Sequence, residues 1–242
     1  MFRTFAFTDP HCGPDIVACR TRRPSEGLSR VEKAVIAAVK AHADLIVCLG
    51  DLCNGGPRYE CEGYAYEAMR IIRSSGIKTL VLPGNHDLIA MPETSFCETA
   101  GDSLAPFSFR AGESIFVFLD ACYTDDGRRY DRGADWKNSY CGGGQAKRLS
   151  RLFESENPPG GFYIFSHQPF DPDCEKRHVV RNSGGILEII KKSGRGRVRA
   201  LIAGHYHPGM INRGENYDFI TLPALCEGDG TDIPERCLIL DT

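Results

Sequence analysis

The first third of the chain alternates short apolar runs with amphipathic helical patterns, and this alternation constrains the fold more than any other feature. The predicted elements follow the order strand, helix, strand, helix and strand, at residues 2–8, from residue 29, 45–49, 65–75 and 79–82. This order favours parallel pairing in one sheet, because each helix returns the chain to the same starting edge. We therefore expect an α/β fold.

The first of these helices has a clear predicted start. Ser29-Arg-Val-Glu32 has the form of a capping box, in which the serine and glutamate side chains bond free backbone N–H groups of the first turn. Val31, Val35 and Val39 recur at helical spacing, which predicts one apolar face.

The rest of the chain is richer in strands. Strands are predicted at residues 114–119, 162–165, 198–203, 219–222 and 237–240, with helices at 145–153 and 186–192. No internal repeat and no low-complexity linker divides the sequence. We expect mixed sheets and a single domain that spans residues 1–242.

Composition excludes several classes of protein. The 29 Lys and Arg against 32 Asp and Glu give a net charge of −3, which argues against a dedicated nucleic-acid or membrane-surface binder. No apolar run approaches the roughly 18 residues of a membrane span, and residues 1–8 lack the layout of a cleavable signal. We expect a cytoplasmic globular protein without a membrane partner.

The 11 cysteines are numerous, but no pair has the CxxC spacing of a zinc ribbon or a thioredoxin-like site. Several lie inside apolar runs, as Cys48 does, where reduced cysteine serves as a small core side chain. Cys12, beside His11, is interpreted in the same way. Unpaired thiols are consistent with a reducing compartment.

Polar side chains follow five of the predicted strands at the point where each strand ends. The candidate site residues after these strands are Asp9, His11, Asp51, Asn85, His86, His167, His205 and His207. Ligands collect outside the carboxyl ends of strands in open α/β sheets, so these side chains are expected to meet. Histidines or aspartates at one strand end could be simple caps, but five such strand ends in order argue against that interpretation.

Imidazole, carboxylate and amide donors without a thiolate suit Mn²⁺, Fe or Zn²⁺. Seven donors are too many for one catalytic ion with an open position, but they suffice for two ions if one carboxylate bridges. Two ions about 3.5–4 Å apart can hold both non-bridging oxygens of a phosphate and activate a bound water. His86, next to Asn85, is then placed to assist the leaving oxygen.

The ordered motifs resemble those of the calcineurin-like metallophosphoesterase superfamily. They are Asp9-x-His11, Gly50-Asp51, Gly84-Asn85-His86-Asp87, His167 and Gly204-His205-x-His207. The resemblance implies a β-sandwich of two mixed sheets flanked by helices, in four layers. It also implies a phosphoesterase that cleaves phosphodiester or phosphomonoester bonds by attack of a metal-bound water or hydroxide, with a small phosphate ester as substrate.

The resemblance assigns each ligand to one of two metals. Asp9, His11 and His207 would hold the first ion and Asn85, His167 and His205 the second, with Asp51 bridging and His86 facing the phosphate. All of these positions are intact, which disfavours the alternative of a non-catalytic scaffold of the same fold.

The second and third motifs differ from those of two subfamilies of this superfamily. Protein Ser/Thr phosphatases carry GDxxDRG followed by GNHE, whereas this chain has Asn54 and Gly55 in place of Asp-Arg and ends the third motif in Asp87. Asn54 also stands where purple acid phosphatases carry a tyrosine ligand. These departures disfavour a protein-phosphatase-type monoesterase, which is kept as an alternative.

The Gly144-Gln145 helix before the fourth motif loosely resembles class III cyclic-nucleotide phosphodiesterases, which favours small diesters. The segment at residues 124–144 is long for a structureless connection, and it is equally consistent with a binding lid and with a solvent loop. Several basic and aromatic side chains could contact the substrate or only solvent. In this segment they are Arg128, Arg129, Arg132 and Trp136, and near the first motif they are Arg20, Arg22 and Arg23. His42 is interpreted as a helix-end residue and His178 as part of a solvated charge run.

Overall fold

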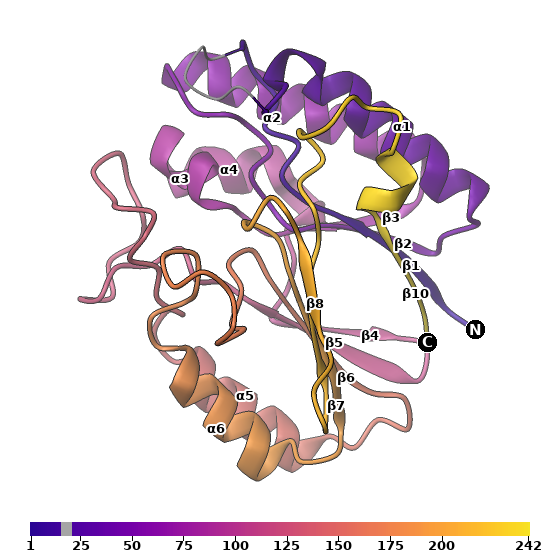
Figure 1. The fold of residues 1–242 in the computed structure, drawn as a ribbon, viewed down its shortest axis with the longest axis vertical. Coiled ribbons are helices and arrows are strands. Elements are labelled where there is room, and N and C mark those ends of the chain that lie inside the picture. Colours follow the sequence, from indigo (N-terminus) through magenta and orange to yellow (C-terminus); the bar gives the residue numbers. More distant parts are fainter. Residues whose placement is uncertain (16–20) are drawn as a thin grey trace.

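The computed structural model describes residues 1–15 and 21–242, which form two sheets with helices on their outer faces (Figure 1). The first sheet has the strand order β10-β1-β2-β3. Its strands are β1 (Arg3–Phe7), β2 (Leu45–Cys48), β3 (Lys78–Val81) and β10 (Leu238–Asp241). The first three are parallel and β10 is antiparallel to β1. The predicted parallel core of this sheet is confirmed.

The second sheet has the order β4-β5-β6-β7-β9-β8. Its strands are β4 (Ser108–Ala111), β5 (Ser114–Leu119), β6 (Gly161–Ser166), β7 (Val198–Ala203), β8 (Met210–Asn212) and β9 (Asp218–Thr221). Strands β5, β6, β7 and β9 run parallel, while β4 and β8 pair antiparallel at the two edges. Both sheets are therefore mixed, as predicted.

Helices cover the outer face of each sheet. Near the first sheet lie α1 (Gly27–Lys40), α2 (Arg58–Arg73), α3 (Asn85–Ala90) and α4 (Glu93–Ala100) (Figure 1). Against the second sheet lie α5 (Gln145–Ser155) and α6 (Ser183–Ser193). Short 3₁₀ turns are η1 (Pro24–Glu26), η2 (Gly101–Ser103) and η3 (Ile233–Arg236).

Three apolar cores separate these four layers, because strands buried on both faces send alternate side chains in opposite directions. In β1, Phe5 and Phe7 pack toward α1 and α2, whereas Ala6 packs between the sheets against Phe116 and Phe165. The third core lies between the second sheet and helices α5 and α6. The expected β-sandwich flanked by helices is confirmed.

Two helix starts differ from the sequence prediction. Helix α1 begins at Gly27, after η1, and no side chain caps its first turn, so the capping box predicted at Ser29 does not form. Its buried face uses Val31, Ala34, Val35 and Ala38, while Val39 is 48% exposed. Helix α2 begins at Arg58, seven residues before the predicted start, because its first turns carry mostly polar side chains that give no apolar pattern.

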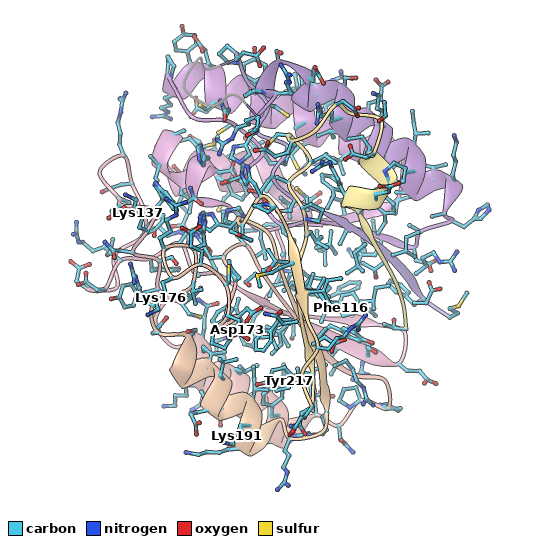
Figure 2. All side chains as sticks on the ribbon, in the orientation of Figure 1. Phe116, Lys137, Asp173, Lys176, Lys191 and Tyr217 are labelled. Atoms are coloured by element: carbon cyan, nitrogen blue, oxygen red, sulfur yellow. The ribbon has the colours of Figure 1, made fainter. Side chains whose placement is uncertain are left out.

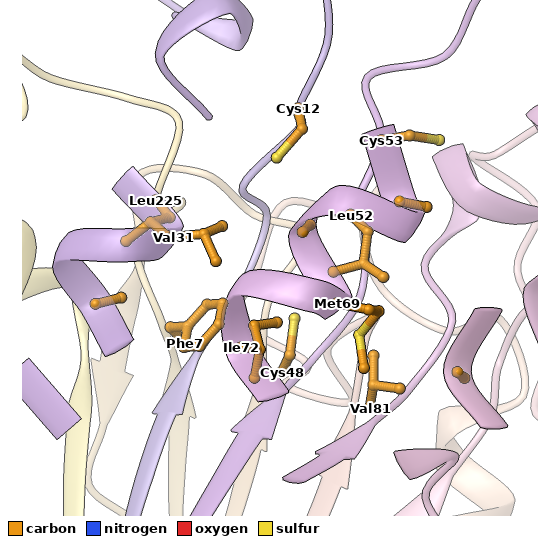
Figure 3. Close-up of a cluster of buried hydrophobic side chains, with 14 of the residues drawn as sticks. Phe7, Cys12, Val31, Cys48, Leu52, Cys53, Met69, Ile72, Val81 and Leu225 are labelled. Carbon is orange, nitrogen blue, oxygen red and sulfur yellow. The ribbon is translucent and has the colours of Figure 1, made fainter. Parts of the chain in front are cut away.

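Cysteines occupy the core between the first sheet and its helices. Figure 3 shows Cys12, Cys48 and Cys53 among Phe7 and Met69. None of the ten cysteines in the described part of the chain forms a disulfide, and eight of them are buried. Cys19 lies outside the described residues. Within the described residues, no helix is long and apolar enough to cross a membrane.

Candidate metal centre

All eight predicted site residues lie where strand ends of both sheets meet. Asp9 and His11 follow β1, Asp51 follows β2, and Asn85 and His86 open α3 after β3; His167 follows β6, and His205 and His207 follow β7. All of these except His86 and His207 are less than 9% exposed. The carboxyl ends of parallel strands converge here, which places residues far apart in the sequence side by side.

The first group of donors contains Asp9, His11 and His207. His11 Nε2 lies 3.4 Å from Asp9 Oδ1 and 3.1 Å from His207 Nε2. His207 Nε2 lies 3.5 Å from Asp9 Oδ1. Three donor atoms at these spacings can surround a single cation.

The second group contains Asn85, His167 and His205. His167 Nε2 lies 3.1 Å from Asn85 Oδ1. The donor atoms of His167, His205 and Asp51 are all within 4.8 Å of one another. Asp51 belongs to both groups, since its Oδ2 is 3.3 Å from His167 Nε2 and 3.4 Å from His11 Nε2.

Two donor atoms of the site lack any hydrogen-bond partner although they are buried. They are Asp9 Oδ1 and His205 Nε2, one in each group. A buried polar atom without a partner costs roughly 1–3 kcal/mol, so such atoms need an explanation. A bound cation in each group would satisfy both, and the mixed nitrogen and oxygen donors fit Mn²⁺, Fe or Zn²⁺.

Further hydrogen bonds fix the orientation of the donors. His167 Nδ1 donates to the Leu49 carbonyl at 2.7 Å, and His207 Nδ1 donates to Glu227 Oε1 at 2.8 Å. The backbone N–H of His86 donates to Asp51 Oδ1 at 2.7 Å, which leaves Oδ2 for the shared position. Such second contacts hold a ligating imidazole in the required tautomer.

Burial sets the protonation of His11 and His205. Burial lowers the pKa of His11 to about 3 and holds the pKa of His205 well below its usual value. Both rings are neutral and keep a lone pair free. Burial also opposes the charged form of His167, but the charge of Asp51 and a hydrogen bond to it raise the pKa of His167 to about 9. A cation in that place would displace this proton.

The backbone at the site adopts a conformation that L-residues rarely use. Five non-glycine residues in the described part of the chain have positive φ, and four of them are Asp9, His11, Asp51 and His205, at 54°, 45°, 55° and 64°. Strain of about 1–3 kcal/mol for each residue persists only where the surroundings enforce it, and it concentrates at functional sites. The fifth residue is His42, in the turn after α1.

The glycines of the motifs allow the ligand loops to touch. A Cβ at Gly84 would lie 2.1 Å from Asp51 Oδ1, and one at Gly204 would lie 2.6 Å from Asp9 Oδ2. Such contacts are far shorter than van der Waals distances. Gly84 before Asn85 and Gly204 before His205 therefore have a packing role that explains their place in the motifs.

His86 is oriented by the loop after Asp51. Its Nδ1 donates to the Asn54 carbonyl at 2.8 Å, which leaves Nε2 as the free ring atom. Gly55, at φ 91°, lies beside it, and a Cβ there would be 3.4 Å from His86 Nδ1. Asp87 accepts hydrogen bonds from the N–H groups of Gly84 and Cys53, so it ties the second and third motifs together.

Two residues near the first group carried no predicted role. Glu227, which holds His207, lies in a loop after β9 that matches no motif. The sulfur of Cys226 is within 4.8 Å of the donor atoms of His11 and His207. Burial raises the pKa of the Cys226 thiol, so it is protonated and a weak ligand.

A pocket of about 470 Å³ opens above the donors, and its lining includes Asp51, Asn85 and His86. His178 and Trp136 form part of its wall. The His178 ring is 4.9 Å from the His205 ring and 5.2 Å from the Trp136 ring. The interpretation of His178 as a solvated charge is wrong, because the loop after β6 folds back and places its ring, with a side chain 15% exposed, against a candidate ligand.

The segment at residues 124–144 contributes Trp136 to this wall, but its arginines lie elsewhere. Arg129 pairs with Asp120 and Glu93, and Arg128 pairs with Asp126 at the surface. Arg132 is exposed. Figure 2 labels Lys137 in the loop between β5 and α5 and Lys176 in the loop between β6 and α6, both on the left of the view. Trp136 therefore lines the pocket, whereas the arginines of the same segment do not.

The three arginines near the first motif also differ in position. Arg22 lines the pocket, Arg23 is exposed, and Arg20 lies outside the described residues. Gln145, in contrast, has a structural role: its Oε1 accepts from the Asp120 N–H and its Nε2 donates to the Asp120 carbonyl. This pair joins α5 to the end of β5, which gives Gln145 of the Gly144-Gln145 pattern a structural role.

The calcineurin-like phosphoesterase family model matches residues 2–209 of the chain. The mouse (Mus musculus) protein named serine/threonine-protein phosphatase CPPED1 is 25% identical over 207 residues. That match covers 80% of this chain and 64% of the relative, so the chain spans less than two thirds of the relative's length.

Solved structures share the fold at low identity. A dimetal phosphatase from Danio rerio has a TM-score of 0.78 and 17% identity, and covers 95% of this chain and 89% of its own. The protein TT1561 of Thermus thermophilus has a TM-score of 0.64 and 13% identity, with 99% and 98% covered.

Proposed function

The chain belongs to the calcineurin-like phosphoesterase family, and from this membership we propose that it is a metal-dependent hydrolase of phosphate esters. Two ions, Mn²⁺ or Fe with Zn²⁺ as a further possibility, would be its cofactors. Asp9, His11 and His207 would hold the first ion. Asn85, His167 and His205 would hold the second, and Asp51 would bridge.

The single observation that carries the proposal is the position of Asp51. Its Oδ2 lies almost equally far from His11 Nε2 and His167 Nε2, one in each donor group, at 3.4 and 3.3 Å. Asp9 Oδ1 in the first group and His205 Nε2 in the second are buried without a hydrogen-bond partner. A shared carboxylate between two incomplete donor sets is what a pair of ions requires.

When bound, the ions would polarise the phosphate and lower the pKa of a water molecule. The chain's own residues then orient and assist. His86 has its Nδ1 engaged with the Asn54 carbonyl, so Nε2 is the atom that would face the leaving oxygen. Burial lowers the pKa of His86, and the charge of Asp51 opposes that effect.

The test is hydrolysis of an aryl phosphate and a bis-aryl phosphate by the Mn²⁺-loaded protein. Chelation is expected to abolish activity, and Asp51→Asn to reduce it by roughly a thousandfold or more, since several kcal/mol of charge stabilisation depend on the ions. Asp102→Asn, at an exposed position, is the matched control. Full activity of the chelated protein would overturn the proposal.

A second candidate is a monoesterase of the protein-phosphatase type, because the curated relatives bear that name. Asn54 and Gly55 depart from the protein-phosphatase motif at the positions beside His86. A phosphopeptide in the substrate panel distinguishes this activity from small-ester hydrolysis. A metal-loaded protein that turns over none of the substrates would favour the third candidate, a non-catalytic scaffold.

We further propose that residues 1–242 form one domain and that the protein works in a reducing compartment such as the cytoplasm. The site takes donors from strand ends of both sheets, which supports a shared domain. The ten described cysteines without disulfides support a reducing location.

A further inference from the structure

Arg22 differs from the other charged groups in the pocket wall because no carboxylate pairs with it. Among the described residues, no ion pair involves Arg22, and its Nε is buried without a hydrogen-bond partner. The second arginine of the wall, Arg177, is paired with Glu175 at 2.8 Å. Arg22 therefore contributes a positive charge without a direct ion pair among the described residues, although the carboxylate of Glu227 lies near enough for its pKa to be lowered by Arg22.

The contacts of Arg22 place it beside the metal centre. Its Nη1 donates to Asn54 Oδ1 at 3.0 Å and lies 3.5 Å from His11 Nδ1. The carbonyl of the same Asn54 accepts from His86 Nδ1. One residue thus holds the guanidinium with its side chain and the imidazole with its backbone.

A half-buried guanidinium without a counter-ion is costly unless an anion completes it. The planar N–H groups of an arginine match two oxygens of a phosphate or a carboxylate. Because Arg22 lies beside His11 and binds Asn54, which also contacts His86, a substrate phosphoryl group at the donors is the partner that we infer for it.

The oxygen count of the substrate then becomes decisive. A phosphate diester has two non-bridging oxygens, and a pair of ions engages both. A phosphate monoester has a third non-bridging oxygen and a second negative charge. Only the monoester therefore leaves an anionic oxygen for a guanidinium.

We propose that Arg22 binds the third non-bridging oxygen of a phosphate monoester and so makes monoesters the preferred substrate class of this site. The inference rests on the proposed function and deepens it. Asn54 contacts both Arg22 and His86. The diester preference suggested by the Gly144-Gln145 pattern is replaced by a monoester preference.

The test compares Arg22→Gln and Arg22→Lys with the matched control Arg23→Gln, whose side chain is exposed. With Mn²⁺ present, Arg22→Gln is expected to lower kcat/KM for an aryl phosphate by about 10- to 100-fold, as for a lost hydrogen bond to a charged group. For a bis-aryl phosphate the expected loss of kcat/KM is less than about threefold, because a diester has no third non-bridging oxygen whose hydrogen bond to Arg22 could be lost. Arg22→Lys restores the charge but not the paired donors, so an intermediate loss is expected.

Binding of inorganic phosphate to the Mn²⁺-loaded protein, measured by calorimetry, gives a readout that needs no turnover. Arg22→Gln is expected to weaken it by at least about tenfold, whereas Arg23→Gln leaves it unchanged. An equal loss for monoester and diester, or unchanged phosphate binding, would overturn the assignment of Arg22. A wild type that binds phosphate in an Arg22-dependent way but hydrolyses neither ester would instead contradict the proposed function.

Discussion

The site has two parts that are built in different ways. The metal floor consists of the seven candidate ligands, Asp9, His11, Asp51, Asn85, His167, His205 and His207. The pocket rim consists of Arg22, Trp136 and His178. Six floor residues are at most 6% exposed, and four floor residues are held in left-handed backbone conformations. The rim residues are half-buried on connecting loops.

The difference follows from how each part is positioned. Every floor residue lies within a few residues of a strand end, and glycines let the floor loops pack in direct contact. Rim residues depend on the path of longer connections and on ring contacts such as that between Trp136 and His178. A rigid floor suits fixed chemistry, whereas a rim on loops suits the selection of a substrate.

The largest effect is expected from adding a side chain at Gly84, where two loops of the metal floor are in direct contact. Gly84→Ala would place a Cβ 2.1 Å from Asp51 Oδ1 and 2.3 Å from its backbone nitrogen, and neither backbone can yield easily. We expect a loss of about 3 kcal/mol in the free energy of unfolding, typical of severe overpacking, and loss of metal binding. Denaturant unfolding and metal analysis measure both.

The matched control for that change is Gly63→Ala. Gly63 lies in α2, and a Cβ there meets no atom within 4 Å. The control is expected to be neutral or to stabilise the protein by up to about 1 kcal/mol through helix propensity. Equal stability of the two variants would refute the role of Gly84 in packing the floor.

His86 lines the pocket but is not a candidate ligand. Its removal therefore tests the catalytic step without removing a metal ligand. His86→Ala is expected to lower kcat by about 10²- to 10⁴-fold, the usual range for a lost proton donor or acceptor. Both ions are expected to stay, because no predicted ligand is removed. His42→Asn, which suits the positive φ of that turn, is the control. Loss of both metals from the His86 variant would reassign it as a structural residue.

The smallest effect is expected at the rim. Trp136→Ala removes a ring that packs on His178 and His205. Steady-state kinetics are expected to show KM for an aryl phosphate raised by about three- to tenfold with kcat nearly unchanged, since an aromatic contact contributes about 0.5–1.5 kcal/mol. Arg132→Ala, at an exposed position of the same segment, is the control. A larger fall in kcat than in affinity would place Trp136 with the floor.

The sequence predicted the floor because strand ends and motif glycines are local signals. All seven candidate ligands lie close together in the structure, and strands β5 and β7 match their predicted ranges. The start of α2 and the edge strands β4 and β8 were missed, since short or polar-faced elements leave little apolar periodicity.

The rim could not be predicted in the same way. His178 follows a charged run, and only the folded loop after β6 reveals its contact with His205. Arg22, Arg23 and Arg128 look alike in the sequence, but only Arg22 reaches the pocket in the described part of the chain. Glu227 is separated from His207 by 20 residues and matches no motif. Tertiary packing, which leaves no local pattern, decides these positions.

The central claim is that the floor holds two metal ions that share Asp51. Anomalous scattering at the manganese edge, from crystals of the Mn²⁺-loaded protein, tests it most directly. The account predicts two peaks, one among Asp9, His11 and His207 and one among Asn85, His167 and His205, with Asp51 between them. A single peak, or none at full metal loading, would contradict it.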